Sequence, residues 1–274
     1  MKNKPKLLIL MVVLIPGFLG LTGFAPAPKD PPGKTKNDAF QAGEKLEFRV
    51  HYGAVTAGIA KMEIKEKPVT VNGRECFHIV GKGVSSRTFS LFFRVNDRYE
   101  TFVDREHLIP YKYKRRIEEG SFKHYTEVEF DQNGHKAYER KSGVSHIETY
   151  EVPPLIQDVM SAFYFARTQD FSDAKPGDIT TYHNFIDRKV HNLDVEFVGR
   201  EVIEVGSMKY KTVRLKPLVR EGGIFQHEGD LVLWITDDKN RIPVRVESGL
   251  VIGSIQVDLK KAENLRHPMT SRVR

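Results

Sequence analysis

The feature that most constrains this chain is a period-two alternation of apolar and polar side chains, which recurs along most of its length. In the first example, Leu46 and Phe48 flank Glu47. Successive side chains of a β-strand point to opposite faces of a sheet, so this pattern predicts a strand with one buried face. Turn residues separate such segments, and Asn72-Gly73 is the strongest two-residue hairpin signal among them.

The same alternation continues between the turns as far as the C-terminal region. The predicted strands cover residues 46–52, 60–65, 76–80, 98–103, 111–117, 122–130, 135–140, 180–186, 191–198, 208–217, 230–236, 241–247 and 251–259. This number of short strands predicts a mainly β fold, an antiparallel meander that forms an open barrel or a curved sandwich.

One segment breaks the alternation and predicts a single main helix over about 154–167. It begins at Pro153-Pro154, and proline is tolerated in a first helical turn because its missing N–H has no partner there. Its apolar residues recur at helical spacing. These residues are Leu155, Ile156, Val159, Met160 and Phe163. We expect an amphipathic helix that packs on the sheet.

Residues 1–25 have the layout of a secretory signal peptide. Three lysines lie among the first six residues, an uncharged apolar run follows over 7–21, and small residues come after it. The run is short for a membrane span, and Pro16-Gly17 would break a spanning helix. An uncleaved anchor is the alternative. We therefore expect an exported protein, periplasmic or secreted in a bacterium, and membrane-peripheral at most after cleavage.

Charge and cysteine content exclude several classes of protein. The formal net charge falls from +7 to +4 once the three lysines of the signal segment are removed, which weakens the case for a nucleic-acid partner. The chain has one cysteine, so it has no intramolecular disulfide and no multi-cysteine zinc site. Cys76 lies in a strand-like segment and is expected to be a core residue.

The rest of the chain divides into three parts. Residues 26–40 are rich in proline and lysine and are expected to form a flexible lead-in. Residues 41–260 form a single β-rich domain. Residues 261–274 form a basic C-terminal tail without periodicity, whose last dozen residues are expected to fray.

Nothing in the sequence matches a known catalytic, phosphate-binding, dinucleotide-binding or zinc motif, and we predict no catalytic residue, cofactor or metal. Three clusters of polar residues remain as candidates. They either form ion pairs and caps that hold the helix and turns to the sheet, or they form a polar rim around a groove. These residues are Arg94, Asp97 and Arg98, then Asp158, Tyr164 and Arg167, and finally Asp237, Asp238 and Arg241.

Five large apolar residues are the candidates for lining a ligand cavity, and each could equally be simple core. They are Met62, Met160, Phe163, Phe165 and Trp234. The favoured hypothesis is non-catalytic binding of a hydrophobic or lipid-like ligand in the open barrel, with the helix as a lid. One alternative is a structural or assembly protein that meets an envelope protein through a surface or a sheet edge. Another is an envelope-polymer hydrolase that uses Asp158 or the Asp237-Asp238 pair.

Several segments together resemble one protein family. They are Ala42–Phe48, Tyr52-Gly53, Ala57-Gly58, Asn96–Glu100, Gln157–Tyr164, Gly199–Glu201, Leu233–Asp238 and Arg241–Val244. In this order and spacing they resemble the bacterial exported proteins grouped as domain of unknown function 3108 (DUF3108), over about 42–260. The resemblance implies an exported, predominantly β protein with an architecture similar to the open barrels of periplasmic lipoprotein carriers. It brings no established catalytic residues.

Overall fold

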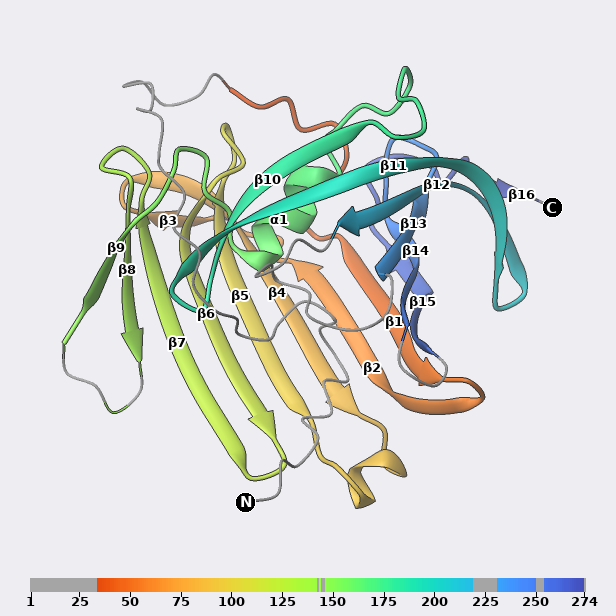
Figure 1. Cartoon of the computed structure of the whole chain (residues 1–274), viewed down its shortest axis with the longest axis horizontal. Coiled ribbons are helices and arrows are strands. Elements are labelled where there is room, and N and C mark those ends of the chain that lie inside the picture. The colour runs from red at the N-terminus through yellow and green to blue at the C-terminus, as the bar shows by residue number, and fades with distance from the viewer. Residues whose placement is uncertain (1–33, 142, 144–145, 219–230, 250–253, 274) are drawn as a thin grey trace.

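A computed structural model describes residues 34–273 except 142, 144–145, 219–230 and 250–253. The predicted signal peptide and residues 26–33 of the predicted lead-in lie outside the described residues. Within them, one large antiparallel sheet curves around a single α-helix (Figure 1). The mainly β fold predicted from the alternation is therefore confirmed.

The strands follow the chain almost as a meander. They are β1 (Lys45–Tyr52), β2 (Val55–Ile64), β3 (Val69–Val71), β4 (Arg74–Ser85), β5 (Asn96–Asp104), β6 (Pro110–Glu119), β7 (Phe122–Asp131), β8 (Lys136–Lys141), β9 (Glu148–Glu151), β10 (Ile179–Ile186), β11 (Lys189–Val205), β12 (Met208–Leu218), β13 (Leu231–Thr236), β14 (Pro243–Gly249), β15 (Ser254–Glu263) and β16 (Arg272–Val273). Their hydrogen-bonded order is β10-β11-β12-β13-β14-β15-β1-β2-β4-β5-β6-β7-β8-β9, with β3 beside β4 and β16 beside β12. The sheet stays open because β10 and β9 end this order.

Strand β6 shows how alternation divides the two faces of the sheet. Tyr113 is buried on the inner face, whereas Lys112 and Lys114 lie on the outer face. Their ammonium groups lie 2.6 and 3.4 Å from the carboxylate of Glu127 on β7. Surface ion pairs of this kind contribute little to stability, but they keep the outer face hydrated. Alternation along β6 thus separates its lysines from its buried tyrosine.

The α-helix α1 spans Val159–Ala166, which is shorter than the predicted 154–167. The backbone of Gln157 is used by β10: its N–H donates to His183 O at 2.8 Å, and its carbonyl accepts from the Phe185 N–H at 2.8 Å. These groups cannot also make helical bonds. The helix therefore begins after Asp158, whose side chain accepts from the backbone N–H groups of the first turn.

Helix α1 lies inside the curved sheet and contacts two of its strands, β5 and β10 (Figure 1). Met160 is fully buried, and its Cε lies 3.0 Å from the position that a Cβ would take on Gly81 of β4. Glycine at this position therefore permits the helix to approach the sheet closely. On the other side, the ring of Phe165 meets Tyr182 of β10 edge-on, with centroids 6.1 Å apart.

A buried ion pair fixes the C-terminal end of α1. Arg167 is 2% exposed, and its guanidinium donates to both carboxylate oxygens of Glu44 at 2.6 and 2.9 Å. It also donates to the carbonyl of Asn240 at 3.0 and 3.1 Å. The guanidinium lies over the rings of Phe40 and Tyr164, at 5.5 and 5.2 Å from their centroids. The partners of Arg167 come from three places: the segment before β1, the turn before β14, and the helix itself.

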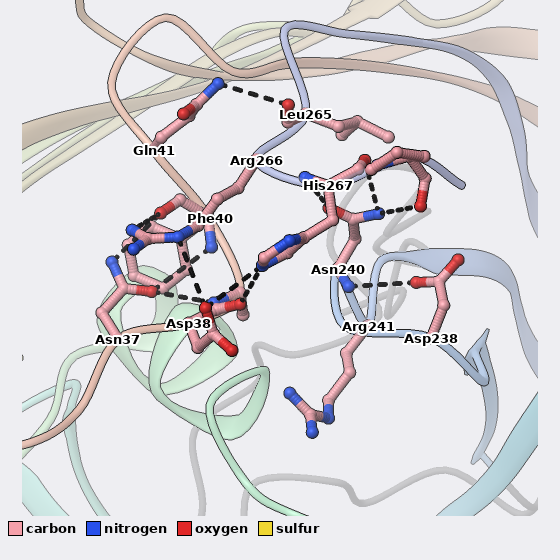
Figure 2. Close-up of polar contacts among 12 residues, drawn as sticks. Asn37, Asp38, Phe40, Gln41, Asp238, Asn240, Arg241, Leu265, Arg266 and His267 are labelled. Atoms are coloured by element: carbon pink, nitrogen blue, oxygen red, sulfur yellow. Dashed lines mark hydrogen bonds and ion pairs between the residues drawn. The ribbon is translucent and has the colours of Figure 1, made fainter. Parts of the chain in front are cut away.

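Arg167 contacts two of three segments that meet in what we call the terminal clamp, residues 37–41, 238–241 and 264–267 (Figure 2). The amide of Asn240 exchanges two hydrogen bonds of 3.0 Å with the backbone of His267. Arg266 donates to the carbonyl of Phe40 at 3.3 Å.

Both ends of the domain differ from the prediction of a flexible lead-in and a fraying tail. Residues Ala39 and Phe40 of the predicted flexible lead-in are fully buried. Instead of fraying, the C-terminal residues form the end of β15 and then β16, in which Arg272 pairs with Tyr210 of β12. The sequence lacks periodicity here because these residues are held by side-chain hydrogen bonds rather than by one buried face.

We expect Glu44→Ala to lower the free energy of unfolding by about 3–5 kcal/mol, because it leaves the buried guanidinium of Arg167 without its counter-charge. Chemical denaturation followed by circular dichroism measures this. The matched control is Glu106→Ala, which removes an exposed ion pair with Lys34 at 3.0 Å and should cost less than about 1 kcal/mol. Equal costs for the two variants would contradict the anchoring role.

Cys76 provides a second check of the packing. Its side chain is fully buried, and burial raises the pKa of the thiol to about 12. The thiolate is the reactive form, so the native protein should not react with a thiol reagent on a timescale of minutes. Full reaction should follow denaturation. Rapid labelling of the native chain would show that this part of the core opens.

Candidate functional site

One hollow lies beside the helix, between the segment 166–178 and strands β10–β12. Its volume is about 290 Å³. We call it the side pocket. Its apolar lining residues are Ala166, Phe171, Ala174, Tyr182, Val195, Phe197 and Leu215. Its polar lining residues are Gln169, Asp170, Asp173, Asp178 and Thr180, most of them exposed at the mouth.

Backbone and ring contacts hold the outer wall of the side pocket in place. The N–H of Gly177 donates to Phe197 O at 2.9 Å, and the N–H of Phe197 donates to Asp178 O at 2.8 Å. The rings of Phe171 and Phe197 are stacked with centroids 6.2 Å apart. Arg200 donates to the Phe171 carbonyl and lies 5.2 Å from the Phe197 ring centroid. The aromatic wall is therefore built into the fold.

A bulge in β11 accompanies this wall. The strand continues through Gly199, where the sequence analysis ended a strand at 198, and the register with β12 shifts between Phe197 and Gly199. Gly199 has φ +150°, which an L-residue rarely adopts. An extra residue at this point bends the strand where Phe197 lines the pocket.

The mouth of the side pocket is acidic. Asp170, Asp173 and Asp178 are exposed there. The backbone N–H of Ser172 lowers the pKa of Asp170, so this carboxylate is charged at neutral pH. The Arg241 guanidinium lies 3.9 Å from Asp170. Three carboxylates around an apolar interior favour a ligand with a hydrogen-bond donor or a cation at its head.

A second hollow of about 280 Å³ lies over β1, β2 and β4. Its side chains are mostly charged and already paired with one another. Lys61 and Lys260 both contact Glu47, at 2.9 and 2.8 Å, and the hydrogen bond from Lys260 lowers the pKa of Glu47. A ligand here would have to break these pairs, so the side pocket is the stronger candidate.

The five apolar candidates from the sequence do not gather around the side pocket. Met160 is packed against Gly81, while Phe165 touches the pocket residue Tyr182 from behind. Trp234 donates from Nε1 to Glu201 at 2.8 Å. The two others, Met62 and Phe163, are half-buried against the core, and Met62 also borders the second hollow. Ligand contact by these five residues stays a prediction.

The first polar cluster is divided between the two faces of β5. Asp97 is buried and accepts from the backbone N–H of Glu118 at 3.0 Å. Arg98 lies on the opposite face and donates to Glu100 at 2.7 Å. Arg94 is exposed in the connection that precedes β5. These three residues do not converge on one site.

Tyr164 and Arg167 of the second cluster meet the third cluster at the C-terminal end of α1. Arg241 donates to the carbonyl of Arg167 at 3.4 Å, and the ring of Tyr164 lies under the Arg167 guanidinium. Asp238 accepts from the backbone N–H of Asn240 at 3.0 Å. The remaining member, Asp237, is exposed and lies 3.2 Å from the Arg200 guanidinium. Sequence distance hides this convergence, because the helix and the turn are about 70 residues apart.

Asp158 has the contacts of a helix cap. It is fully buried, with Oδ1 accepting from the N–H groups of Met160 and Ser161 at 2.8 and 2.9 Å, and Oδ2 accepting from the Thr101 hydroxyl at 2.5 Å. Burial raises its pKa to about 6. A general base must reach a proton on its substrate, and these contacts leave the carboxylate no solvent-facing side. The geometry therefore gives the hydrolase hypothesis no support at this residue.

The open edge of the sheet offers little for assembly by strand addition. Strand β9 has four residues and carries Glu148 and Glu151. At the other end, the segment at Gln157 already bridges to β10. Short, charged edges discourage pairing with another chain.

The side-pocket residues were missed in the sequence analysis. Phe197 and Leu215 fall in predicted strands, but alternation assigns a residue to a face without showing whether that face is filled. Phe171 lies in a segment without periodicity, so no signal placed its ring on Phe197. Among the described residues, no helix is long and apolar enough to span a membrane, and no cluster of His, Cys, Asp and Glu could hold a metal ion.

The fold and pocket define an open-barrel protein built around a helix, and comparison with known proteins gives its family. The model of the family described as "Protein of unknown function (DUF3108)" matches residues 47–260, so this chain belongs to that family. No curated protein matches it. Among solved structures, it resembles the crystal structure of a beta-barrel-like protein of domain of unknown function DUF1849 from Brucella abortus, with 9% identity and a TM-score of 0.52. The match covers 82% of this chain and 99% of that one, and it shows the fold alone.

We expect Asp158→Asn to change how stability depends on pH. The folded-state pKa of about 6 lies above the ordinary value of 3.8, so the folded protein binds the proton more tightly. Stability of the parent chain should therefore fall as pH rises from about 4 to about 6. The amide keeps the cap without this penalty, so the variant should gain relative to the parent by up to about 3 kcal/mol at pH 7.

Urea denaturation at several pH values measures this difference. The companion variant Asp158→Ala loses the cap and should be less stable than Asp158→Asn by about 1–2 kcal/mol. Parallel pH profiles for the parent and Asp158→Asn would contradict the raised pKa.

Proposed function

We propose that this DUF3108 protein is an exported cell-envelope protein that binds an apolar ligand without catalysis. The observation that carries the proposal is the side pocket, an apolar hollow of about 290 Å³ with aromatic walls and an acidic mouth. Ligand sites in proteins combine these two features, a mostly apolar cavity and a few polar groups that orient the ligand.

The size of the pocket limits what it can accept. An apolar cavity of about 150 Å³ holds one benzene molecule, and drug-sized ligands occupy roughly 300–1,000 Å³. The side pocket therefore suits a small apolar molecule, or one end of a longer chain whose remainder lies outside. Stacked Phe171 and Phe197 give it a flat wall that fits a ring or an extended acyl segment.

The negative charge at the mouth of the side pocket restricts which head group a ligand can carry. A carboxylate ligand would place its charge beside Asp170, Asp173 and Asp178, which costs energy by like-charge repulsion. An amine or a hydroxyl group can instead donate to these carboxylates. We therefore propose a ligand with a neutral or cationic head, a narrower class than lipids in general.

Export is a separate part of the proposal. Residues 1–25 have the three-part layout of a signal peptide, and the single cysteine suits an oxidising compartment. Fractionation of bacteria that express the full chain should recover it outside the cytoplasm. The intact mass should show loss of the first 25 to 27 residues. A full-length product in the cytoplasm would contradict export.

Ligand binding is tested with an apolar fluorescent probe and three competitors of equal chain length. Dodecylamine and dodecanol should displace the probe more strongly than dodecanoate does. Leu215→Trp places an indole ring in the pocket. It should weaken probe binding by at least roughly tenfold, because overfilling an apolar site forces its neighbours apart. The matched control Val202→Trp adds the same ring at an exposed position of β11 and should bind like the parent.

The acidic mouth is tested separately. Asp173→Asn with Asp178→Asn should narrow the preference for dodecylamine over dodecanoate, because each amide removes one negative charge. Equal probe binding by the parent and Leu215→Trp would overturn the pocket assignment. An unchanged amine preference in the double variant would overturn only the role of the mouth.

A further inference from the structure

One end of the sheet carries an unusual concentration of exposed apolar side chains. Three connections lie side by side there: the β1–β2 turn, the β4–β5 connection with its 3₁₀ turn η1 (Phe89–Leu91), and the β6–β7 turn (Figure 1). We call residues 52–55, 86–94 and 120–123 the tip surface. Leu91, Phe92 and Phe122 are 81%, 84% and 58% exposed.

The fold holds these side chains outward. The backbone N–H of Gly120 donates to Arg94 O at 2.8 Å, which joins the second and third connections. The ring of Phe93 covers Gly120, with its Cε2 3.3 Å from the position of a Cβ there. The N–H of Ser86 donates to Ala57 O at 2.7 Å and joins the second connection to β2. Leu91 and Phe92 therefore project from a braced turn.

The charge of the tip surface has one sign. Its residues include the exposed cations Arg87, Arg94 and Lys123 and no carboxylate. Within the described part of the chain, none of these three forms an ion pair, in contrast to the paired lysines on the outer face of β6. At the border, Glu118 contacts Arg116 at 2.6 Å and stands opposite Lys123 in the β6–β7 register.

We propose that the tip surface docks on the surface of an anionic lipid bilayer. Leu91, Phe92 and Phe122 enter the boundary between head groups and acyl chains, where aromatic rings are favoured. The three cations then lie at the level of the lipid phosphates, and each is attracted by the negative surface potential. This inference is independent of the side pocket, which contains none of these residues.

A tryptophan reporter in the full chain tests the contact locally. Phe92→Trp should shift its emission to the blue and be quenched by brominated lipid when vesicles of phosphatidylglycerol and phosphatidylcholine are added. The control Val202→Trp has its added tryptophan at an exposed position of β11, away from the tip surface, and should show neither change. This pair separates contact at the tip surface from contact by any other segment.

Two further variants separate the apolar and ionic contributions. Leu91→Ser with Phe92→Ser should reduce vesicle association by at least roughly tenfold, since binding scales with the apolar area that is buried. Arg87→Gln with Arg94→Gln should reduce it roughly fivefold per charge removed, and added salt should do the same to the parent. The control Lys175→Gln with Lys209→Gln removes two exposed cations elsewhere and should have a smaller effect.

Three results would overturn the proposal. The first is an unshifted Phe92→Trp spectrum on anionic vesicles. The second is association with purely phosphatidylcholine vesicles that is as strong as association with the anionic vesicles. The third is stoichiometric binding of another protein at the tip surface by a chain that does not bind vesicles. This result would make the surface a protein interface. Loss of probe binding in the side pocket would leave the outcome unchanged, so failures of the two proposals are distinguishable.

Discussion

The buried guanidinium of Arg167 is the interaction on which the rest of the arrangement depends. It joins the end of α1 to Glu44 before β1 and to Asn240 in the turn between β13 and β14. Removing two charges from water is costly, and the cost is offset only by a geometry in which every donor has a partner. Arg167 also lies in the segment 166–178 that forms one wall of the side pocket. The ion pair thus fixes the helix end and the start of this wall together.

The helix occupies the inside of the open barrel, and this decides where a ligand could bind. Met160 against Gly81 of β4 and Phe165 against Tyr182 of β10 fill the space between these two strands with side chains. A helix packed on both sides is part of the core, so it does not cover a cavity as a lid would. The available apolar volume lies beside it, where the β11 bulge and the stacked ring of Phe171 leave a hollow. Exposed groups with charge of one sign gather at the acidic pocket mouth and at the basic tip surface.

Features that rest on local chemistry could be predicted from the sequence. The two faces of β6 follow from alternation, and Asn72-Gly73 takes the positive φ angles, 51° and 77°, of a tight hairpin. The helix type was predictable, but its first residue was not, because the pairing of Gln157 with β10 competes with the first helical turn. Glu44 and Arg167 are 123 residues apart, and no pattern links them. The side pocket is equally hidden, since a hollow depends on how far apart packed elements stay.

Native mass spectrometry tests the central claim most directly, that the side pocket of this protein holds an apolar ligand. The full chain would be expressed in an export-competent bacterium and recovered without detergent, together with Leu215→Trp and Val202→Trp. The account predicts a one-to-one adduct of a small apolar molecule with a neutral or cationic head on the parent and on Val202→Trp, and its absence on Leu215→Trp. A bare mass for all three proteins after exposure to envelope lipid extract, or the same adduct on all three, would contradict it.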